Sequence, residues 1–237
     1  MVVLQPGYLP WLGFFDQMRR SDVFVYYDDA QYDKHGWRNR NRIKTQRGPI
    51  WLTTPVRHSG LGWPSILDVE IDNRAPWARK HLQSIRQAYA RAPYLQRYLP
   101  PLEDVLSRPW QRLVDLDLAV AALLAEGLGV APRIMRSSEL GIDGERSVRL
   151  LRICQHLGAG VYLSGNAARE YLDVPLFESH GIRVEWQDFA HPVYPQQHGA
   201  FVPYLSALDL LLNCGPTSGD ILRGAAQRHA IVNPCTG

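Results

Sequence analysis

Short apolar runs alternate along this chain with segments of helical periodicity, and this alternation predicts an α/β fold. Residues 1–4 form an apolar strand, and residues 11–20 have the apolar spacing of an amphipathic helix. Residues 23–27 are apolar throughout, as in strands that a parallel sheet buries on both faces. These three segments predict a β-α-β unit at the start of the chain.

The pattern changes after residue 36. Residues 50–56 and 66–71 have β-type composition and are joined by a turn-rich link, so we predict a small β-rich insertion over residues 37–72. Residues 77–130 have a helical pattern, in three segments broken by Pro93, Pro100–Pro101 and Pro109. Further strands are predicted at 133–135, 160–163 and 183–187, and further helices at 147–157, 205–212 and 218–228.

Together these elements predict one α/β domain over residues 1–237, with mainly parallel sheet, the β-rich insertion and the helical middle segment. A two-lobed arrangement is the alternative. The first helix carries Pro10 in its first turn, where a missing N–H costs nothing.

Composition narrows the class of protein. The chain is 46% apolar and 21% charged, which are ordinary globular values. Its three cysteines show neither CxxC nor Cys/His spacing, so we expect no disulfide framework and no metal site. No apolar stretch reaches about 18 residues, so we expect neither a signal peptide nor a membrane partner. The net charge of +3 is too slight to favour nucleic acid, and a cytoplasmic protein is expected, with its cofactor unknown.

Polar side chains gather where three predicted strands end. Gln5 follows the first strand, Asp28 and Gln31 follow the second, and Ser164 and Asn166 follow a later one. Ligands of open α/β sheets bind beyond the carboxyl ends of the strands, so we expect these residues to line one cleft. Taken singly, Asp28 and Ser164 also fit turn formers or helix caps, whereas glutamine is not a preferred cap.

The turn at residues 164–166 leads into a predicted helix. Its backbone N–H groups and the helix dipole favour an anion. The turn holds a single glycine, Gly165, and is equally typical of an ordinary strand-to-helix connection.

The segment from Asn39 to Arg42 alternates amide and guanidinium side chains. On a strand, Arg40 and Arg42 would share one face and the asparagines the other. Two guanidinium groups on one face bind phosphate or carboxylate well, and the flanking Trp37 and Trp51 can wall a sugar or base. A solvated edge strand is the alternative, and we favour the anion site.

Candidate reactive groups come late in the chain. His191 lies in a proline-rich loop and is a candidate general acid or base, with His58 a weaker one. Cys214 precedes a predicted helix, where a thiol pKa can fall, and with His191 it would form an acyl-transfer dyad. The alternatives are a structural histidine bonded to a backbone carbonyl and a cysteine that fills the core. Asp209 could likewise simply face solvent.

Several composite motifs resemble the WbqC-like family over essentially the whole chain. They are Gln5-Pro6-x-Tyr8-x-Pro10-Trp11, Asp28-x-x-Gln31-Tyr32, Trp37-x-Asn39-Arg40-Asn41-Arg42, Trp51-Leu52-Thr53-x-Pro55-Val56, Tyr162-Leu163-Ser164-Gly165 and Phe201-x-Pro203-Tyr204-Leu205-Ser206. The resemblance implies a bacterial protein of surface-polysaccharide or specialised-metabolite biosynthesis. That setting suggests acyl or aminoacyl transfer onto an amino sugar, and the family assigns no residue a catalytic role.

A more distant likeness concerns the fold alone. The first two strands and their turns are reminiscent of nucleotidyltransferase-like enzymes such as pantothenate synthetases. Those enzymes carry a HIGH-type motif where this chain has Trp11-Leu12-Gly13-Phe14. Because both histidines are missing, adenylation chemistry is in doubt.

We therefore predict an acyl- or aminoacyltransferase that modifies the amine of a sugar nucleotide or similar small amine, with an acyl carrier protein as a candidate partner. The catalytic candidates are His191, Cys214 and Asp28. The substrate-binding candidates are Gln5, Tyr8, Gln31, Trp37, Asn39, Arg40, Arg42, Ser164 and Asn166. The alternatives are an ATP-dependent amide ligase with a degenerate nucleotidyltransferase-like fold, and a non-catalytic sugar- or peptide-binding protein that stacks its ligand on Trp37, Trp51 and Trp63.

Overall fold

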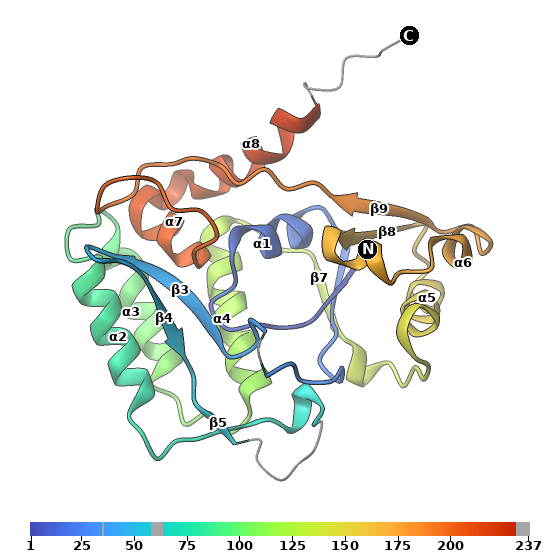
Figure 1. The fold of residues 1–237 in the computed structure, drawn as a ribbon, viewed down its shortest axis with the longest axis horizontal. Helices are drawn as coiled ribbons and strands as arrows, with labels where there is room; N and C mark the ends of the chain where they lie inside the picture. Colours follow the sequence, from blue (N-terminus) through green and yellow to red (C-terminus); the bar gives the residue numbers. More distant parts are fainter. Residues whose placement is uncertain (35, 58–63, 231–237) are drawn as a thin grey trace.

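The parallel strands of the fold form two small sheets. The computed structural model describes residues 1–34, 36–57 and 64–230, so His58 and Trp63 lie outside the described residues. A three-stranded sheet has the order β1 (Val2–Leu4), β2 (Val23–Tyr26) and β7 (Arg133–Arg136). A second sheet pairs β8 (Val161–Gly165) with β9 (Arg183–Gln187). Figure 1 labels β7, β8 and β9 of these two sheets.

Met1 joins these two sheets edge to edge. Its amino group donates to the carbonyl of Val161 and its carbonyl accepts from the N–H of Leu163, both at 2.9 Å. The strands therefore follow the order β7-β2-β1-β8-β9. The chain adds β2 and β7 on one side of β1, and β8 and β9 on the other side. Open α/β sheets place their ligand crevice where the strand order reverses in this way.

Helices cover both faces of the strands, and the period-two alternation of side chains shows which face each residue takes. Val2 and Phe24 pack in the core that includes α1 (Leu12–Arg19) and α4 (Leu113–Leu128). Val3 and Val25 pack in the core of α5 (Arg146–His156) and α6 (Val174–Glu178). Figure 1 shows α4 and α5 on opposite sides of β7, as expected for strands buried on both faces.

The helical middle consists of α2 (Trp77–Ala88), α3 (Leu95–Leu106) and α4. The break predicted at Pro100–Pro101 is wrong, because α3 runs through both prolines. A buried apolar row of α3 packs against α2 and α4 and keeps the helix continuous despite the missing N–H groups; it comprises Leu95, Leu99, Leu102, Val105 and Leu106.

The β-rich insertion is present as two antiparallel pairs. The strands β3 (Arg40–Thr45) and β4 (Gly48–Thr53) form a hairpin, and β5 (Val56–Arg57) pairs with β6 (Glu70–Ile71). The class is therefore mixed α/β with small sheets. The chain ends with α7 (Ala207–Cys214) and α8 (Ser218–Ala230).

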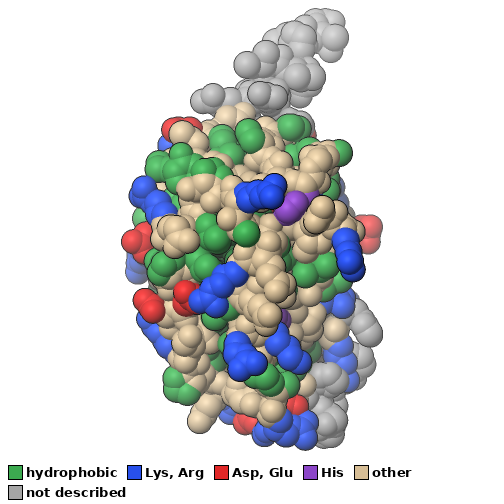
Figure 2. Space-filling model, turned by 90° about the vertical axis from the view of Figure 1, so that its left-hand side faces the viewer, with side chains coloured by type: hydrophobic (Ala, Val, Ile, Leu, Met, Phe, Trp, Pro, Cys, Tyr) green, Lys and Arg blue, Asp and Glu red, His purple; other side chains and the backbone are tan. Residues whose placement is uncertain are grey.

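Figure 2 shows Lys and Arg side chains scattered among apolar and polar ones over the face that carries α2, without forming one broad patch there. No helix in the described ranges is long and apolar enough to cross a bilayer. Within those same ranges, His, Cys, Asp and Glu side chains form no group suited to a metal ion.

Candidate binding site at the end of strand β1

A cavity of about 420 Å³ opens beside the carboxyl end of β1. Its walls come from the β1–α1 turn, the segment that enters β3 and the loop before α7. They comprise Leu4, Gln5, Gly7, Pro10, Trp11, Phe14, Trp37, Arg38, Asn41, Arg42 and Tyr204. The cavity thus lies at the end of β1, the strand at which the strand order reverses.

Two glycines allow the walls to approach closely. A Cβ atom at Gly7 would lie 2.9 Å from the carbonyl oxygen of Trp37, so the β1–α1 turn needs glycine to contact the segment before β3. A Cβ atom at Gly13 would lie 2.1 Å from the indole of Trp11, so Gly13 lets that ring lie across the first turn of α1. The Trp11 ring can therefore serve as a wall of the cavity.

Arg38 is fixed by the turn that follows β1. Its Nη1 donates to the carbonyl oxygens of Gln5 (3.1 Å) and Pro6 (2.8 Å). Its Nε is buried and has no hydrogen-bond partner among the described residues. Burial lowers the pKa of Arg38, and the charge of Asp117 acts in the opposite direction. The side chain remains a cation, because an arginine pKa stays far above neutrality.

Arg42 lies on the outer face of β3 and reaches two aromatic rings. Its guanidinium carbon lies 5.8 Å from the ring centre of Trp37 and 5.7 Å from that of Trp51, and its Nη2 donates to the carbonyl of Tyr204 at 3.3 Å. Arg40 lies over the same Trp51 ring at 4.8 Å. The predicted sharing of one face by the two arginines is therefore observed.

The asparagines take the opposite, inner face, as the alternation predicts. Asn41 is buried and its Nδ2 donates to the carbonyl of Leu9 at 2.6 Å. Asn39 is buried and its Nδ2 donates to the carbonyl of Thr54 at 2.8 Å. Asn39 thus holds the hairpin in place and is not among the residues that line the cavity, although the sequence predicts it to bind substrate.

The charge and shape of the cavity define what it can hold. Arg38 and Arg42 line it, and no Asp or Glu from the described part of the chain does. Its aromatic walls are Trp11, Phe14, Trp37 and Tyr204. Paired guanidinium groups suit phosphate or carboxylate, and the indole faces suit a flat ring or the apolar face of a sugar. The cavity therefore suits a small anionic ligand that also carries a ring.

His191 lies behind the aromatic wall. Its ring centre is 5.5 Å from that of Tyr204 and 5.6 Å from that of Phe201. Nδ1 lies 3.0 Å from the carbonyl oxygen of Pro192, and Nε2 is buried with no hydrogen-bond partner in the described part of the chain. Since a carbonyl only accepts, Nδ1 carries the proton and Nε2 presents a lone pair. Burial also lowers the pKa of His191, which favours this neutral form.

Cys214 does not have the environment expected of a nucleophile. It is the last residue of α7 and is 8% exposed. Burial, with the nearby charge of Asp209, raises the pKa of the thiol, whereas the prediction required a lowered pKa. Neither ring nitrogen of His191 bonds to this thiol within the described residues. The proposed dyad is therefore not assembled, because the thiol lies in the core.

Asp209 is buried and does not face solvent. It accepts hydrogen bonds from the hydroxyl groups of Tyr89 at 2.7 Å and Tyr194 at 2.9 Å. Burial raises its pKa, and these hydrogen bonds act in the opposite direction.

Asp28 ties β2 to the turn after β7. Its carboxylate accepts from Nε of Arg136 (2.6 Å), from the hydroxyl groups of Ser137 (3.1 Å) and Ser138 (2.8 Å), and from the N–H of Ser138 (3.0 Å). Burial alone would raise the pKa of Asp28, but these bonds outweigh it and hold the pKa below its ordinary value. The carboxylate is fully buried and bonded on both oxygens, and Asp28 does not line the cavity, so this geometry gives no support to the catalytic role predicted for it.

Tyr8 also belongs to the core. It is fully buried, and its hydroxyl lies 3.0 Å from Nδ1 of His81. Its ring packs edge-on against Trp77. Burial raises the pKa of the phenol well above its usual range. Tyr8 therefore supports the cavity from behind and does not line it.

The remaining predicted binding residues lie outside the cavity. Gln31 is exposed and forms an isolated bridge with Ser65. Ser164 is buried at the end of β8, and Asn166 is exposed and accepts from Nε of Arg169 at 3.3 Å. The segment that follows is the 3-10 turn η3 (Asn166–Glu170), so no α-helix N-terminus faces an anion there.

Sequence reasoning selected Gln5, Trp37 and Arg42 among the lining residues. The lining residues that it missed include Arg38, Trp11 and Tyr204. Arg38 belongs to the basic run, yet its carbonyl partners lie 32 and 33 residues earlier in the chain. Trp11 and Tyr204 belong to the quoted motifs, and nothing local indicates that they meet.

The fold and the cavity define a mixed α/β protein with a basic, aromatic-walled cavity. The chain belongs to the WbqC-like protein family, whose model matches residues 5–221. It is 35% identical over 229 residues to Rv1507c, an uncharacterized protein of Mycobacterium tuberculosis, and the match covers 96% of this chain and 99% of that protein. No solved structure matches the chain.

Proposed function

We propose that the protein is an acyl- or aminoacyltransferase that modifies the amine of a sugar nucleotide or similar small amine, in surface-polysaccharide or specialised-metabolite biosynthesis. One observation carries the proposal: among the described residues, the cavity at the end of β1 is lined by Arg38 and Arg42, by aromatic side chains and by no Asp or Glu. A diphosphate fits Arg38 and Arg42, because charge-assisted hydrogen bonds to phosphate are strong and directional. The aromatic walls suit the attached rings.

The proposed acyl transfer requires one proton acceptor and an activated acyl donor. The amine nitrogen attacks the carbonyl carbon of a thioester, a C–N bond forms, and the C–S bond breaks with its electron pair on the leaving thiolate. The amine proton passes to Nε2 of His191, whose lone pair is free for it. The acyl group moves directly to the amine, since burial raises the pKa of Cys214 and disfavours its thiolate. An acyl carrier protein is one source of the thioester.

An assay of turnover tests the proposal. The protein is incubated with a panel of nucleotide-linked amino sugars and acyl thioesters, and the acylated product is detected by mass spectrometry. His191→Ala should reduce turnover about 100-fold or more, the range of a general base, while nucleotide binding persists. His180→Ala, which removes an exposed histidine beside α6, is the control. Undiminished turnover of a verified substrate by His191→Ala would remove the proposed base.

A non-catalytic binding protein is the second candidate. The observation that favours it is the buried, unactivated Cys214 together with a His191 that bonds only to a backbone carbonyl in the described chain. Tight ligand binding without turnover across the whole panel would support this candidate over the transferase.

The ATP-dependent ligase has weaker support. Such a ligase requires a phosphate-binding site at residues 164–166, where Ser164 is buried and the side chain of Asn166 accepts a hydrogen bond from Arg169. The short 3-10 turn that follows offers no α-helix dipole.

A further inference from the structure

Tyr204 stands between the cavity and His191. It lines the cavity, and its ring centre lies 5.6 Å from that of Trp11 and 5.5 Å from that of His191. Its side chain is 48% exposed, whereas Tyr194, whose ring centre lies 6.2 Å from that of His191, is buried. Of these two tyrosine rings, Tyr204 is therefore the one with room to move.

The backbone of Tyr204 is strained. Its φ is +58°, a left-handed conformation that residues with a side chain rarely adopt. Such conformations persist where the surrounding structure imposes them, and they concentrate at ligand clamps and switching segments. The conformation of Tyr204 is thus imposed by its surroundings and depends on the contacts that hold it.

Hydrogen bonds hold the chain on both sides of Tyr204, so a change of backbone conformation would be confined to the residues between them. Before it, the N–H of Val202 donates to Oε1 of Gln196 at 2.9 Å and its carbonyl accepts from Nε2 of the same side chain at 3.0 Å. After it, the N–H of Ser206 donates to the carbonyl of Arg42 at 3.0 Å. Tyr204 itself is tethered by a longer, exposed bond of 3.3 Å from Nη2 of Arg42 to its carbonyl.

This hydrogen bond uses the guanidinium of Arg42, which the proposed anionic ligand would also bind. An anion that takes the Arg42 guanidinium competes with the neutral carbonyl of Tyr204, and charged acceptors form the stronger hydrogen bonds. Loss of the tether leaves the strained residue free to relax and carries its ring away from His191.

Movement of the Tyr204 ring would give a ligand access to Nε2 of His191, which has no hydrogen-bond partner among the described residues. A buried acceptor without a partner is costly, so a ligand group that donates to it would gain a favourable hydrogen bond. A neutral amine or hydroxyl of a ligand, placed where the Tyr204 ring now lies, would donate to this nitrogen. The anion and the N–H or O–H donor would then occupy the two ends of one elongated ligand.

We propose that Nε2 of His191 forms a second subsite of the cavity, which accepts an N–H or O–H group of the ligand, and that Tyr204 is the residue that controls entry to it. This inference rests on the proposed function for the identity of the ligand. The accessibility of His191 can be measured without any ligand, so a failure of the nucleotide proposal and a failure of this gate are distinguishable.

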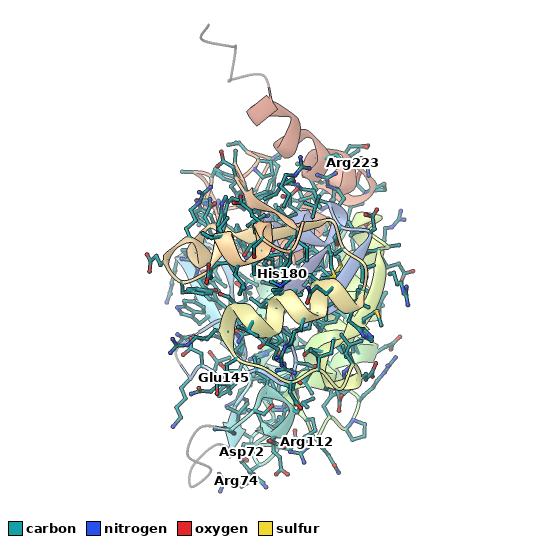
Figure 3. The ribbon with its side chains drawn as sticks, turned by 90° about the vertical axis from the view of Figure 1, so that its right-hand side faces the viewer. Asp72, Arg74, Arg112, Glu145, His180 and Arg223 are labelled. Carbon is teal, nitrogen blue, oxygen red and sulfur yellow. The ribbon has the colours of Figure 1, made fainter. Side chains whose placement is uncertain are left out.

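The test is carbethoxylation by diethyl pyrocarbonate, which attacks unprotonated imidazole nitrogen, followed residue by residue with peptide mass spectrometry. The reference is His180, an exposed histidine at the end of α6 that Figure 3 labels. In the wild-type protein His191 should react much more slowly than His180. Tyr204→Gly removes the ring and suits the positive φ, and it should accelerate His191 at least tenfold.

Two variants and one internal probe complete the design. Tyr204→Phe keeps the ring and should leave the His191 rate unchanged, and Arg42→Met removes the tether and should raise the rate several-fold. The buried His81 reports general loosening. An unchanged His191 rate in Tyr204→Gly, or an equal rise at His81, would overturn the proposal.

Discussion

The guanidinium of Arg42 donates a hydrogen bond to the carbonyl of Tyr204 at 3.3 Å, across 162 residues of chain. This contact joins the β3–β4 hairpin to the loop before α7 and closes the cavity at the end of β1. It connects a guanidinium suited to bind an anion with one of the aromatic residues in contact with His191. In the proposed gate, this side chain links binding to the access of ligand to His191.

Gly7→Ala should distort the cavity and destabilise the fold. The added Cβ would lie 2.9 Å from the carbonyl oxygen of Trp37, and a backbone atom cannot move aside as a flexible side chain can. We expect a loss of about 1–3 kcal/mol in the free energy of unfolding, as for overpacked positions. Urea denaturation measures it.

Gly160→Ala is the matched control for this variant. A Cβ atom there meets nothing within 4 Å, so its free energy of unfolding should change by less than about 0.5 kcal/mol. Equal stabilities of the two variants would contradict the close approach at Gly7.

Asp28→Asn should destabilise the protein by about 2 kcal/mol at pH 7, because it breaks a buried ion pair that is partly open to solvent on the Arg136 side. The pKa of Asp28 is lowered in the folded state, so its contribution is present above the unfolded pKa and is lost as the pH falls through the folded pKa. The difference between the wild type and the variant should therefore shrink below about pH 4. Urea denaturation at pH 7 and pH 3 checks both statements, and a gap that widens in acid would be inconsistent with them.

Asp117→Asn should stabilise the protein at pH 7. Asp117 is fully buried on α4, and both of its carboxylate oxygens lack hydrogen-bond partners in the described chain. Burial raises its pKa well above the ordinary value, and the charge of Arg38 opposes the shift. The folded state keeps a proton that the unfolded state releases above about pH 4, so stability is lost as the pH rises from there.

The neutral asparagine avoids this loss, and we expect a gain of about 1–2 kcal/mol at pH 7 and none near pH 4. Asp115→Asn, an exposed position on the same helix, should stay within about 0.5 kcal/mol of the wild type. Thermal or urea unfolding over this pH range measures both. A stability loss at pH 7 in Asp117→Asn would show that the carboxylate has a partner.

Cys214 should alkylate slowly. Burial raises the pKa of its thiol, so the reactive thiolate is scarce at pH 7. Iodoacetamide labelling, followed on the peptide that contains Cys214, should be far slower than the labelling of glutathione. Cys214→Ala should leave ligand affinity within about twofold. Labelling at the rate of a free thiol at pH 7 would contradict this prediction and support a covalent role for Cys214 with His191.

Local patterns in the sequence predicted the elements well, and they predicted the face that a residue takes. The alternation from Asn39 to Arg42 is a property of any strand, so the arginines could be placed on one face without knowledge of the fold. Gln5 could be placed at the end of β1 for the same reason.

Contacts between distant segments explain what the sequence could not predict. Parallel strands do bring the ends of β1, β2 and β8 to one edge, but Arg136 from β7 takes the carboxylate of Asp28 there. Arg38 reaches the cavity because Gly7 has no side chain and the backbone of Trp37 can lie close to it. No local sequence pattern predicts this contact. The positive φ of Tyr204 arises from its anchored neighbours and is likewise invisible in the residue pattern.

The central claim is that Arg42 binds the anionic part of a ring-bearing ligand in the cavity at the end of β1. Isothermal titration calorimetry with uridine diphosphate, at low salt, tests it most directly with the wild type, Arg42→Met and the control Arg47→Met, which removes an exposed cation at the β3–β4 turn. A lost charge-assisted hydrogen bond is worth about 1.5–3 kcal/mol, so Arg42→Met should weaken binding roughly ten- to hundredfold, and Arg47→Met should not. Equal affinities for all three proteins, or no binding by the wild type at millimolar nucleotide, would contradict the claim.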